Sequence, residues 1–262
     1  MAAATISPAL FKAYDIRGVV GSTLTDGAVR QIGTALGSVA REKGIAAICV
    51  GRDGRLSGPM LRDALVAGII STGTDVIDVG MVPTPVLYFA TVELQTGSGV
   101  EITGSHNPPE YNGLKMMLGG TTLHGDAIQA LRMRIERGDL VGSATPGAER
   151  MADVLPAYLE RIRTTVKLAR PMKIAIDAGN GVAGPTAAAL FRALGCDVVE
   201  LFTDIDGTFH NHHPDPAHPE NLQDLIRALR ETDAELGLAF DGDGDRLGVV
   251  TKDGQIIYPD RQ

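Results

Sequence analysis

The sequence contains the same local pattern twice, once near residue 50 and once near residue 175. Each copy has a short apolar stretch, a glycine-rich loop, a helix opened by Gly-Pro, a Gly-x-Asp turn and a second apolar stretch; the copies span residues 48–79 and 174–201. Proline in the first helical turn and glycine at the end are typical of helix boundaries. Two such strand–helix–strand units, each expected to cross over with a right hand, predict an α/β protein of two related α/β/α modules with mixed, mostly parallel sheets.

Apolar periodicity and turn residues predict the remaining elements. Residues 1–24 are interpreted as an extended lead-in and residues 138–149 as a linker. Asp253 and Gly254 indicate a hairpin turn. We expect helices at 25–43, after Pro85, at 125–137 and at 153–166, strands at 46–50, 99–102 and 115–118, and a second sheet from 173–176, 198–202, 236–240 and 247–251. The predicted domains are residues 1–150, residues 151–255, and residues 256–262 as the start of a truncated third domain.

Composition excludes some classes of protein. The 262 residues are 44% hydrophobic and 21% charged, which is typical of a soluble globular chain, and the net charge of -8 argues against nucleic acid as a partner. No apolar run reaches membrane-spanning length and the N-terminus lacks a basic leader, so we expect no membrane association and a cytoplasmic location. Cys49 and Cys196 lie in or beside apolar runs, which predicts two buried free thiols.

One loop combines several residues suited to chemistry. Thr103-Gly104-Ser105-His106-Asn107-Pro108-Pro109 follows a predicted strand, so Ser105 should lie on the loop at that strand's end. Its hydroxyl can be phosphorylated, His106 can exchange a proton, and Lys115 can return as a base or a cation. A proline-rich turn with a capping serine is the alternative for this motif alone.

A second loop is rich in carboxylates. Asp241, Asp243 and Asp245 alternate with glycines between two apolar stretches, and three such oxygens can bind one hard cation, best Mg²⁺. A calcium EF-hand is excluded because its sixth position holds Arg246 and its twelfth holds Lys252. A plain acidic turn remains the alternative, although packed acids repel one another without a cation.

Together the two loops resemble those of the α-D-phosphohexomutases, the phosphomannomutase/phosphoglucomutase family. Three further stretches extend the resemblance in the family's order over about 230 residues: Tyr14-Asp-Ile-Arg17-Gly18, Gly51-Arg-Asp-Gly-Arg55 and Asp177-Ala-Gly-Asn-Gly-Val-Ala-Gly184.

The resemblance implies an enzyme that interconverts hexose 1-phosphate and 6-phosphate through a hexose 1,6-bisphosphate, which also serves as activator. Ser105 would carry the phosphoryl group, Lys115 would act as the base, and His106 would orient the hydroxyl or assist proton transfer. Magnesium would be bound by Ser105 and the three aspartates. Tyr14, Arg17, Asn107 and Arg246 would contact substrate or phosphate. A monomer is expected.

Two stretches suggest other chemistry. Asp204 follows an apolar stretch in a pattern that resembles the nucleophile loop of haloacid-dehalogenase-type phosphatases, but only 54 residues follow Thr208. His210, His212, His213 and His218 could bind zinc, although a polar loop fits as well and the hexomutases have a similar segment. A binding module without catalysis is the third alternative.

The chain departs from the family at its end. It stops at Gln262 without the Gly-Glu-x-x-Gly-His and Arg-x-Ser-Gly-Thr segments that the family uses for sugar and phosphate. We therefore expect a two-domain portion with very low mutase activity of its own. The sugar cannot be predicted.

Overall fold

The computed structural model describes residues 6–262, which form two compact units. Among the described residues, unit 1 contains 6–81 together with Leu87–Asp153, and unit 2 contains Val82–Val86 together with Val154–Gln262. The sequence did not predict that the short segment Val82–Val86 packs with the second unit. The domain boundaries at residues 150 and 255 stay predictions.

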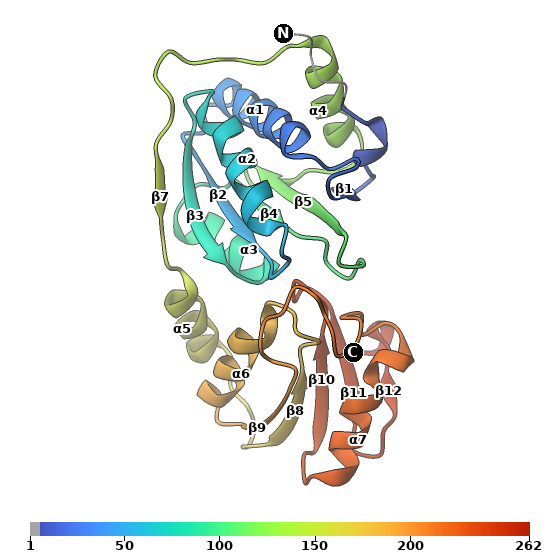
Figure 1. Ribbon diagram of the computed structural model, residues 1–262. Helices are drawn as coiled ribbons and strands as arrows, with labels where there is room; N and C mark the ends of the chain where they lie inside the picture. Colours follow the sequence, from blue (N-terminus) through green and yellow to red (C-terminus); the bar gives the residue numbers. More distant parts are fainter. Residues whose placement is uncertain (1–5) are drawn as a thin grey trace. The chain divides into compact units, whose positions relative to one another are not determined.

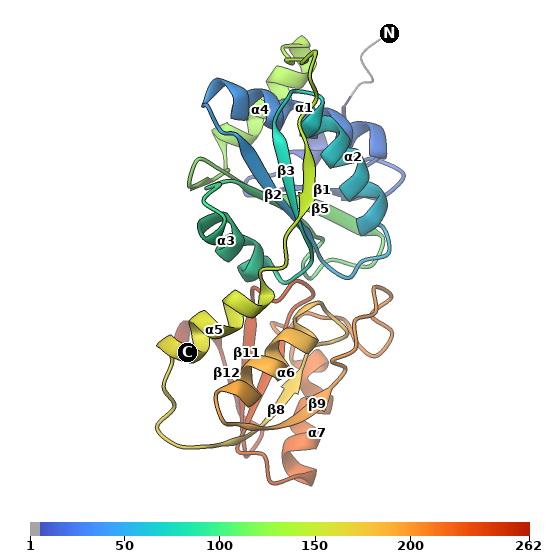
Figure 2. The same cartoon turned by 90° about the vertical axis from the view of Figure 1, so that its left-hand side faces the viewer.

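Unit 1 is built on a mixed sheet, shown in Figures 1 and 2. Four neighbouring strands are parallel and two antiparallel strands extend one side, so the predicted mixed, mostly parallel sheet is confirmed. The order is β1 (Ile16–Val19), β5 (Tyr111–Leu118), β4 (Gly99–Ile102), β2 (Ala47–Arg52), β3 (Asp75–Met81) and β7 (Glu149–Met151), with β6 (Thr121–Thr122) beside β5.

Helices cover both faces of this sheet. Figure 2 shows α1 (Asp26–Glu42) and α2 (Gly58–Ile70) on one face and α3 (Thr84–Glu93) on the other. Thr25 caps α1 by accepting a hydrogen bond from the amide of Ala28 at 3.2 Å. The helix α4 (Asp126–Arg137) packs against α1 and ends at Gly138 in the left-handed conformation, and a short 3₁₀ turn spans Pro8–Leu10.

Glycines let α1 and α2 approach closely. A Cβ on Gly68 would lie 2.2 Å from the carbonyl oxygen of Arg30, and a Cβ on Gly33 would lie 2.4 Å from that of Leu65. Apolar side chains of both helices then pack on the sheet in one core with β2 and β4.

Three expectations for unit 1 need correction. The lead-in contains β1, which pairs with β5, and β5 begins at Tyr111 rather than at Lys115. The predicted linker ends in β7, which pairs with β3 in parallel. Its residues are all exposed, so no alternation of buried and exposed side chains indicated a strand; Arg62 holds it by pairing with Asp78 and Glu149.

Unit 2 is built on a smaller mixed sheet. The order is β12 (Ile256–Ile257), β11 (Leu247–Thr251), β10 (Leu236–Phe240), β8 (Lys173–Asp177) and β9 (Asp197–Leu201), of which the last three are parallel. The predicted strands and the turn at Gly254 are confirmed. Apolar side chains of α6 (Ala183–Ala193) and α7 (Gln223–Glu231) pack on this sheet in separate clusters, and α5 (Leu155–Thr165) contacts α6. Short 3₁₀ turns span Pro219–Leu222 and Pro259–Arg261.

Both repeats form the predicted strand–helix–strand unit, β2–α2–β3 in unit 1 and β8–α6–β9 in unit 2. Because β2 and β4 are parallel neighbours, the glycine loop after β2 and the loop of Ser105 after β4 lie at the same edge of their sheet. In unit 2, the glycine loop after β8 and the carboxylate loop after β10 likewise share one edge.

Both cysteines are buried and free, as predicted. Burial raises the pKa of the Cys49 thiol, and its Sγ lies 3.3 Å from the hydroxyl of Thr96.

Candidate functional site

Ser105 lies on the loop directly after β4, as the sequence predicted. Its side chain is almost fully buried, with 2% relative exposure, and its backbone is in the left-handed region with φ of 49°. This conformation costs a residue with a side chain roughly 1–2 kcal/mol, so the surrounding structure must enforce it.

Two neighbours fix the serine. The amide of Ser105 donates to the hydroxyl of Thr103 at 2.7 Å, and its own Oγ lies 3.2 Å from Nδ1 of His106. That contact lets the imidazole exchange a proton with the hydroxyl or orient it.

Asp53 and Arg55 hold the loop of Ser105 through hydrogen bonds from the neighbouring glycine loop after β2. Both side chains are fully buried and form an ion pair at 3.2 Å. The Asp53 carboxylate also accepts from the hydroxyl of Thr103 at 2.8 Å and the amide of Gly104 at 3.3 Å. Their motif, Gly51-Arg-Asp-Gly-Arg55, resembles the family's, but no role was predicted for either residue. The available signal was a pair of charged residues directly after a buried strand that neighbours the strand of the serine.

The other predicted site residues of unit 1 differ in their contacts and in their exposure. Lys115 of β5 lies directly opposite the buried Glu101 of β4 in the antiparallel register. The side-chain amide of Asn107 donates to the carbonyl of Gly104 at 3.0 Å, so it braces the loop. Arg17 of β1 pairs with Asp15, and Tyr14 is 80% exposed. The structure therefore brings Ser105, His106 and Asn107 together on one loop.

The carboxylate loop lies between β10 and β11. One oxygen from each of Asp241, Asp243 and Asp245 lies within 4.8 Å of the others, and the first two residues are buried whereas the third is exposed. The amides of Asp245 and Arg246 both donate to Asp241 Oδ1 at 3.0 Å, which turns the loop around that carboxylate.

Thr84 braces this loop from the segment Val82–Val86. Its hydroxyl donates to Asp243 Oδ2 at 2.6 Å and its amide donates to the carbonyl of the same residue at 3.0 Å. Gly244 has φ of 73°, and a Cβ there would lie 2.8 Å from Cβ of Ala183. The guanidinium of Arg246 has no described partner, since only its backbone bonds to Asp241 are seen.

The donor set fits a magnesium ion. Mg²⁺ prefers oxygen ligands at about 2.1 Å, so ligands on opposite sides of one ion lie about 4.2 Å apart. Three oxygens within 4.8 Å need only small shifts to reach that spacing. Strands flank the loop on both sides, which agrees with the exclusion of an EF-hand.

The glycine loop of unit 2 is closed by a pair between the half-buried His212 and the buried Asp177. Nε2 of His212 lies 3.0 Å from each carboxylate oxygen of Asp177, and the imidazole packs edge-on against Phe202 at 5.3 Å between ring centres. Burial disfavours the charged imidazole, but the hydrogen bond and charge of Asp177 outweigh it and hold the pKa of His212 above its ordinary value.

This glycine loop is not a ready anion site. The amide of Gly179 donates to Asp177, that of Asn180 to the carbonyl of Phe202, and that of Val182 to the carbonyl of Gly242. With these donors used inside the protein, the loop serves as a turn.

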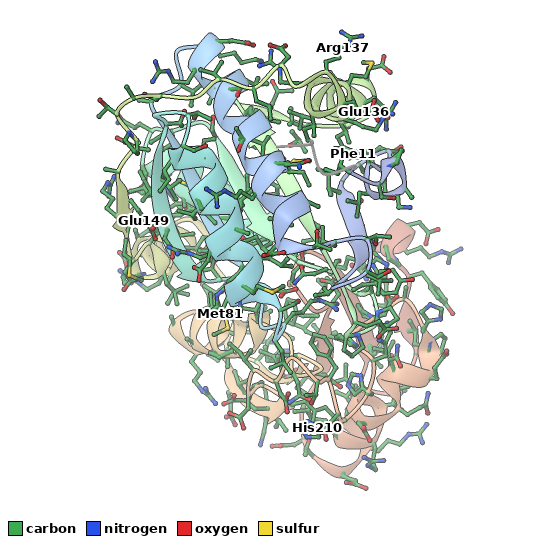
Figure 3. All side chains as sticks on the ribbon, turned by 45° about the horizontal axis from the view of Figure 1, so that its top comes forward. Phe11, Met81, Glu136, Arg137, Glu149 and His210 are labelled. Atoms are coloured by element: carbon green, nitrogen blue, oxygen red, sulfur yellow. The ribbon has the colours of Figure 1, made fainter. Side chains whose placement is uncertain are left out.

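Nothing in the described residues favours the alternative chemistries. Asp204 is exposed, and its carbonyl accepts from the side chain of Asn180 at 3.0 Å. Across residues 6–262, the one group of potential metal ligands that the structure brings together contains no histidine. His210, labelled in Figure 3, is exposed and pairs with Asp206 at 2.9 Å.

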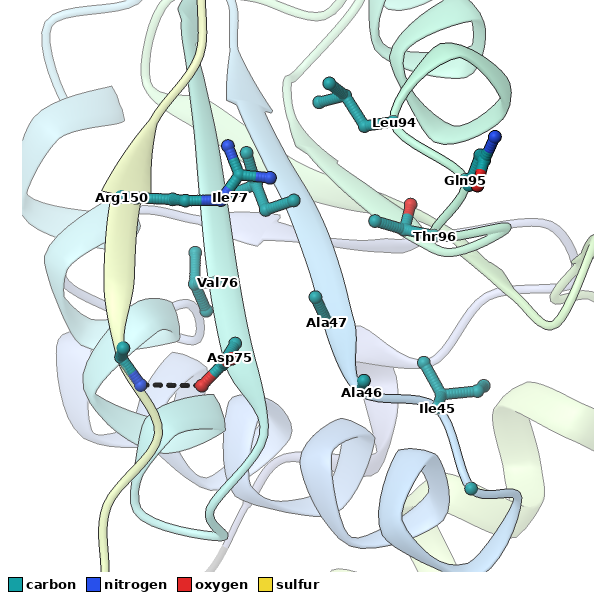
Figure 4. Close-up of a pocket in the computed structure, with 12 residues that line it drawn as sticks. Ile45, Ala46, Ala47, Asp75, Val76, Ile77, Leu94, Gln95, Thr96 and Arg150 are labelled. Carbon is teal, nitrogen blue, oxygen red and sulfur yellow. Dashed lines mark hydrogen bonds between the residues drawn. The ribbon is translucent and has the colours of Figure 1, made fainter.

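A cavity of about 540 Å³ in unit 1 lies away from the serine loop (Figure 4). It is lined by the starts of β2 and β3 and by Arg150, which extends from β7 across β3. At its rim, Asp75 accepts from the amide of Ala148 at 2.7 Å. These are the amino ends of parallel strands, whereas Ser105 follows a carboxyl end. The cavity is therefore separate from the serine loop.

Comparison with known protein families decides the family. Models of the phosphoglucomutase/phosphomannomutase α/β/α domains I and II match residues 8–141 and 156–254. The chain belongs to the phosphoglucomutase/phosphomannomutase family. The predicted resemblance is thereby confirmed, and so is the fold class of two α/β/α domains.

Individual relatives carry the same family names. The chain is 60% identical to a phosphoglucomutase of Neisseria gonorrhoeae and 54% identical to a phosphomannomutase/phosphoglucomutase of Pseudomonas aeruginosa, each over 99% of this chain. A crystal structure of a phosphoglucomutase/phosphomannomutase family protein from Burkholderia thailandensis matches 97% of the chain and 57% of its own length, with 57% identity and a TM-score of 0.93. The chain spans 56% of the length of the two curated relatives.

In the described part of this family member, no helix is both long and apolar enough to cross a membrane.

Proposed function

We propose that the protein containing this chain is a phosphohexomutase that interconverts hexose 1-phosphate and hexose 6-phosphate. The observation that carries this proposal is the buried hydroxyl of Ser105, held in a left-handed backbone and 3.2 Å from a histidine nitrogen. Membership of a family whose relatives are phosphoglucomutases and phosphomannomutases supports the choice of reaction.

In the proposed reaction, the phosphoryl group moves between Ser105 Oγ and a sugar hydroxyl. The bond from phosphorus to Oγ breaks as the bond to the sugar oxygen forms; the sugar's hydroxyl proton passes to Lys115, and the released Oγ takes up a proton with the assistance of His106. In the return step Ser105 Oγ gives that proton back and bonds to the other phosphorus of the hexose 1,6-bisphosphate, while the sugar oxygen released from it takes the proton from Lys115. Phosphorus and protons therefore balance over the cycle. His106 would orient the hydroxyl, and Arg17, Arg246, Tyr14 and Asn107 would contact phosphate or sugar oxygens.

Asp241, Asp243 and Asp245 would hold Mg²⁺, with an oxygen of the phosphorylated Ser105 as a further ligand in the proposal. When bound, the ion neutralises charge on the transferring phosphoryl group. The support for this assignment is the trio of clustered carboxylates, two of them buried.

Phosphoserine formation tests the proposal. The 262-residue chain would be incubated with glucose 1,6-bisphosphate and Mg²⁺, and intact mass with peptide mapping would locate any added phosphate. We expect one phosphoryl group on Ser105, none in Ser105→Ala, and normal labelling in Ser22→Ala, which alters an exposed serine. Asp204→Asn should also label normally. Loss of labelling in that variant would instead support the phosphatase alternative, and no labelling of the wild-type chain would support a binding module.

We further propose a cytoplasmic monomer that uses hexose 1,6-bisphosphate as its activator and binds neither nucleic acid nor membranes. Two buried free thiols suit a reducing compartment. Sedimentation analysis tests the monomer, since a mass of two chains would contradict it.

A further inference from the structure

We propose that Arg55 is the positioning residue of the serine loop, holding Ser105 in the conformation from which its hydroxyl receives and releases a phosphoryl group. This inference rests on the proposed function. Arg55 does not contact the phosphoryl group in this scheme. It acts through the backbone of the loop.

Every N–H of the Arg55 guanidinium has an acceptor. Nε binds Asp53, and the two terminal nitrogens donate to four main-chain carbonyl oxygens of the serine loop and its exit. These are Pro108 at 2.7 Å and Tyr111 at 3.0 Å for Nη1, and Ser105 at 2.8 Å and Asn107 at 2.6 Å for Nη2. A guanidinium has five N–H donors, so this set uses all of them.

Lysine cannot replace this geometry. An ammonium has three donors around one point, whereas the carbonyls here are spread along a planar fork. Arg55→Lys keeps the charge next to Asp53 and loses the simultaneous hold on both ends of the loop.

Gly104 lies directly against the guanidinium. A Cβ at this position would lie 2.5 Å from both Cζ and Nε of Arg55. A side chain at residue 104 would push the loop away from the guanidinium. The absence of a side chain at Gly104 and the contacts of Arg55 therefore depend on each other.

The backbone on both sides of the nucleophile is therefore fixed. The amide of Ser105 is held by Thr103, and its carbonyl is held by Arg55. Only the side-chain torsion remains to place Oγ. Because Asp53 balances the charge and the five donors are used, Arg55 should affect the rate of transfer rather than the affinity for the phosphate donor.

The test measures the rate of Ser105 phosphorylation at several concentrations of glucose 1,6-bisphosphate. In Arg55→Lys we expect the maximal rate to fall by about a hundredfold, the typical effect of displacing a reacting atom by about 1 Å. The half-saturating concentration should change little. Arg227→Lys, which alters an exposed arginine paired with Asp224, is the matched control and should label at the wild-type rate.

Destabilisation alone gives a different result. Partial unfolding lowers the fraction of chains that label and leaves the rate of the folded fraction unchanged. A wild-type rate in Arg55→Lys, or a change confined to half-saturation, overturns the inference.

A second variant tests the contact itself. Gly104→Ala should slow labelling as Arg55→Lys does. In a chain that already carries Arg55→Ala, the further change Gly104→Ala should slow labelling little, because the side chain with which it clashes has been removed. If the effects of Gly104→Ala and Arg55→Ala on the labelling rate are fully additive, the contact between residues 104 and 55 does not control the rate.

Amide hydrogen exchange separates this inference from the proposed function. In Arg55→Lys, protection should be lost over residues 104–111 and kept in β2 and β4. If the wild-type chain does not become phosphorylated, the proposed function is wrong. The protection of the loop from amide hydrogen exchange still tests the positioning role of Arg55. Unchanged protection in the loop would then refute its positioning role.

Discussion

The imidazole of His212 lies 3.0 Å from both carboxylate oxygens of Asp177, thirty-five positions earlier in the chain. The pair fastens the loop after β9 to the glycine loop after β8. The charged groups that act on His212 are Asp177, in direct contact, and Asp224 of α7 through its negative charge, and the carbonyl of His213 accepts from its Nδ1 at 3.0 Å.

This pair makes the stability of unit 2 depend on pH. The pKa of His212 is raised in the folded chain, so its contribution is fully present below the unfolded pKa of about 6.5 and is lost as pH rises through the folded pKa. We expect the gap in unfolding free energy between wild type and His212→Gln to shrink as pH rises from about 5 to about 9. Urea unfolding at both values measures it. Asn211→Gln, which alters an exposed residue of the same loop without a titratable side chain, is the control, and its difference from wild type should not change with pH.

Removing the charge of Asp53 should destabilise unit 1. Asp53→Asn leaves the guanidinium of Arg55 buried without a counter-charge, and breaking a buried pair costs about 3–5 kcal/mol. Chemical denaturation measures the loss. Asp63→Asn is the control, because its side chain is 72% exposed and a surface pair contributes roughly 0–1 kcal/mol. Equal losses in the two variants would show that burial of the pair is unimportant.

Magnesium should reverse the order of stability of two proteins. Without a cation, Asp243→Asn relieves repulsion among clustered carboxylates and should be at least as stable as wild type. With Mg²⁺ at about 100 times its Kd, wild type should gain about 2.7 kcal/mol and the variant far less. Thermal unfolding with chelator and with Mg²⁺ measures both. Asp253→Asn, in the exposed hairpin turn, should respond as wild type does. An equal response of Asp243→Asn would exclude this loop as the metal site.

Two glycine substitutions should have opposite effects. Gly68→Ala places a Cβ 2.2 Å from the carbonyl of Arg30 and should cost about 1–3 kcal/mol or more. Gly27→Ala, in the first turn of α1, meets only the Thr25 hydroxyl at 3.9 Å and should stabilise by about 0.5–1 kcal/mol. Thermal unfolding of both variants compares them. A Gly68→Ala variant as stable as wild type, or more stable, would contradict the close helix contact.

The sequence predicted most elements because their signals are local. Apolar spacing marked α1 and α4, and the repeated glycine loops marked both strand–helix–strand units. The placement of Ser105 at a strand end followed for the same reason.

The missed features are non-local or lack a pattern. The strand β7 is exposed along its length, so only its pairing with β3 defines it. Arg55 reaches carbonyls about fifty residues later, and Thr84 lies 159 residues before Asp243. Charged residues in a glycine loop do not reveal which partner they will find, because parallel strands bring together loops that are distant in the chain.

The bond from Thr84 to Asp243 has a consequence for any attempt to treat the two halves as interchangeable parts. A gene fusion or protease cut at residue 153 would separate the acidic triad from the threonine that braces it, although the cut lies outside both helices and strands. When modules are exchanged between relatives, the segment Val82–Val86 must therefore be transferred together with the second unit. Otherwise the carboxylate loop loses the hydrogen bonds from Thr84.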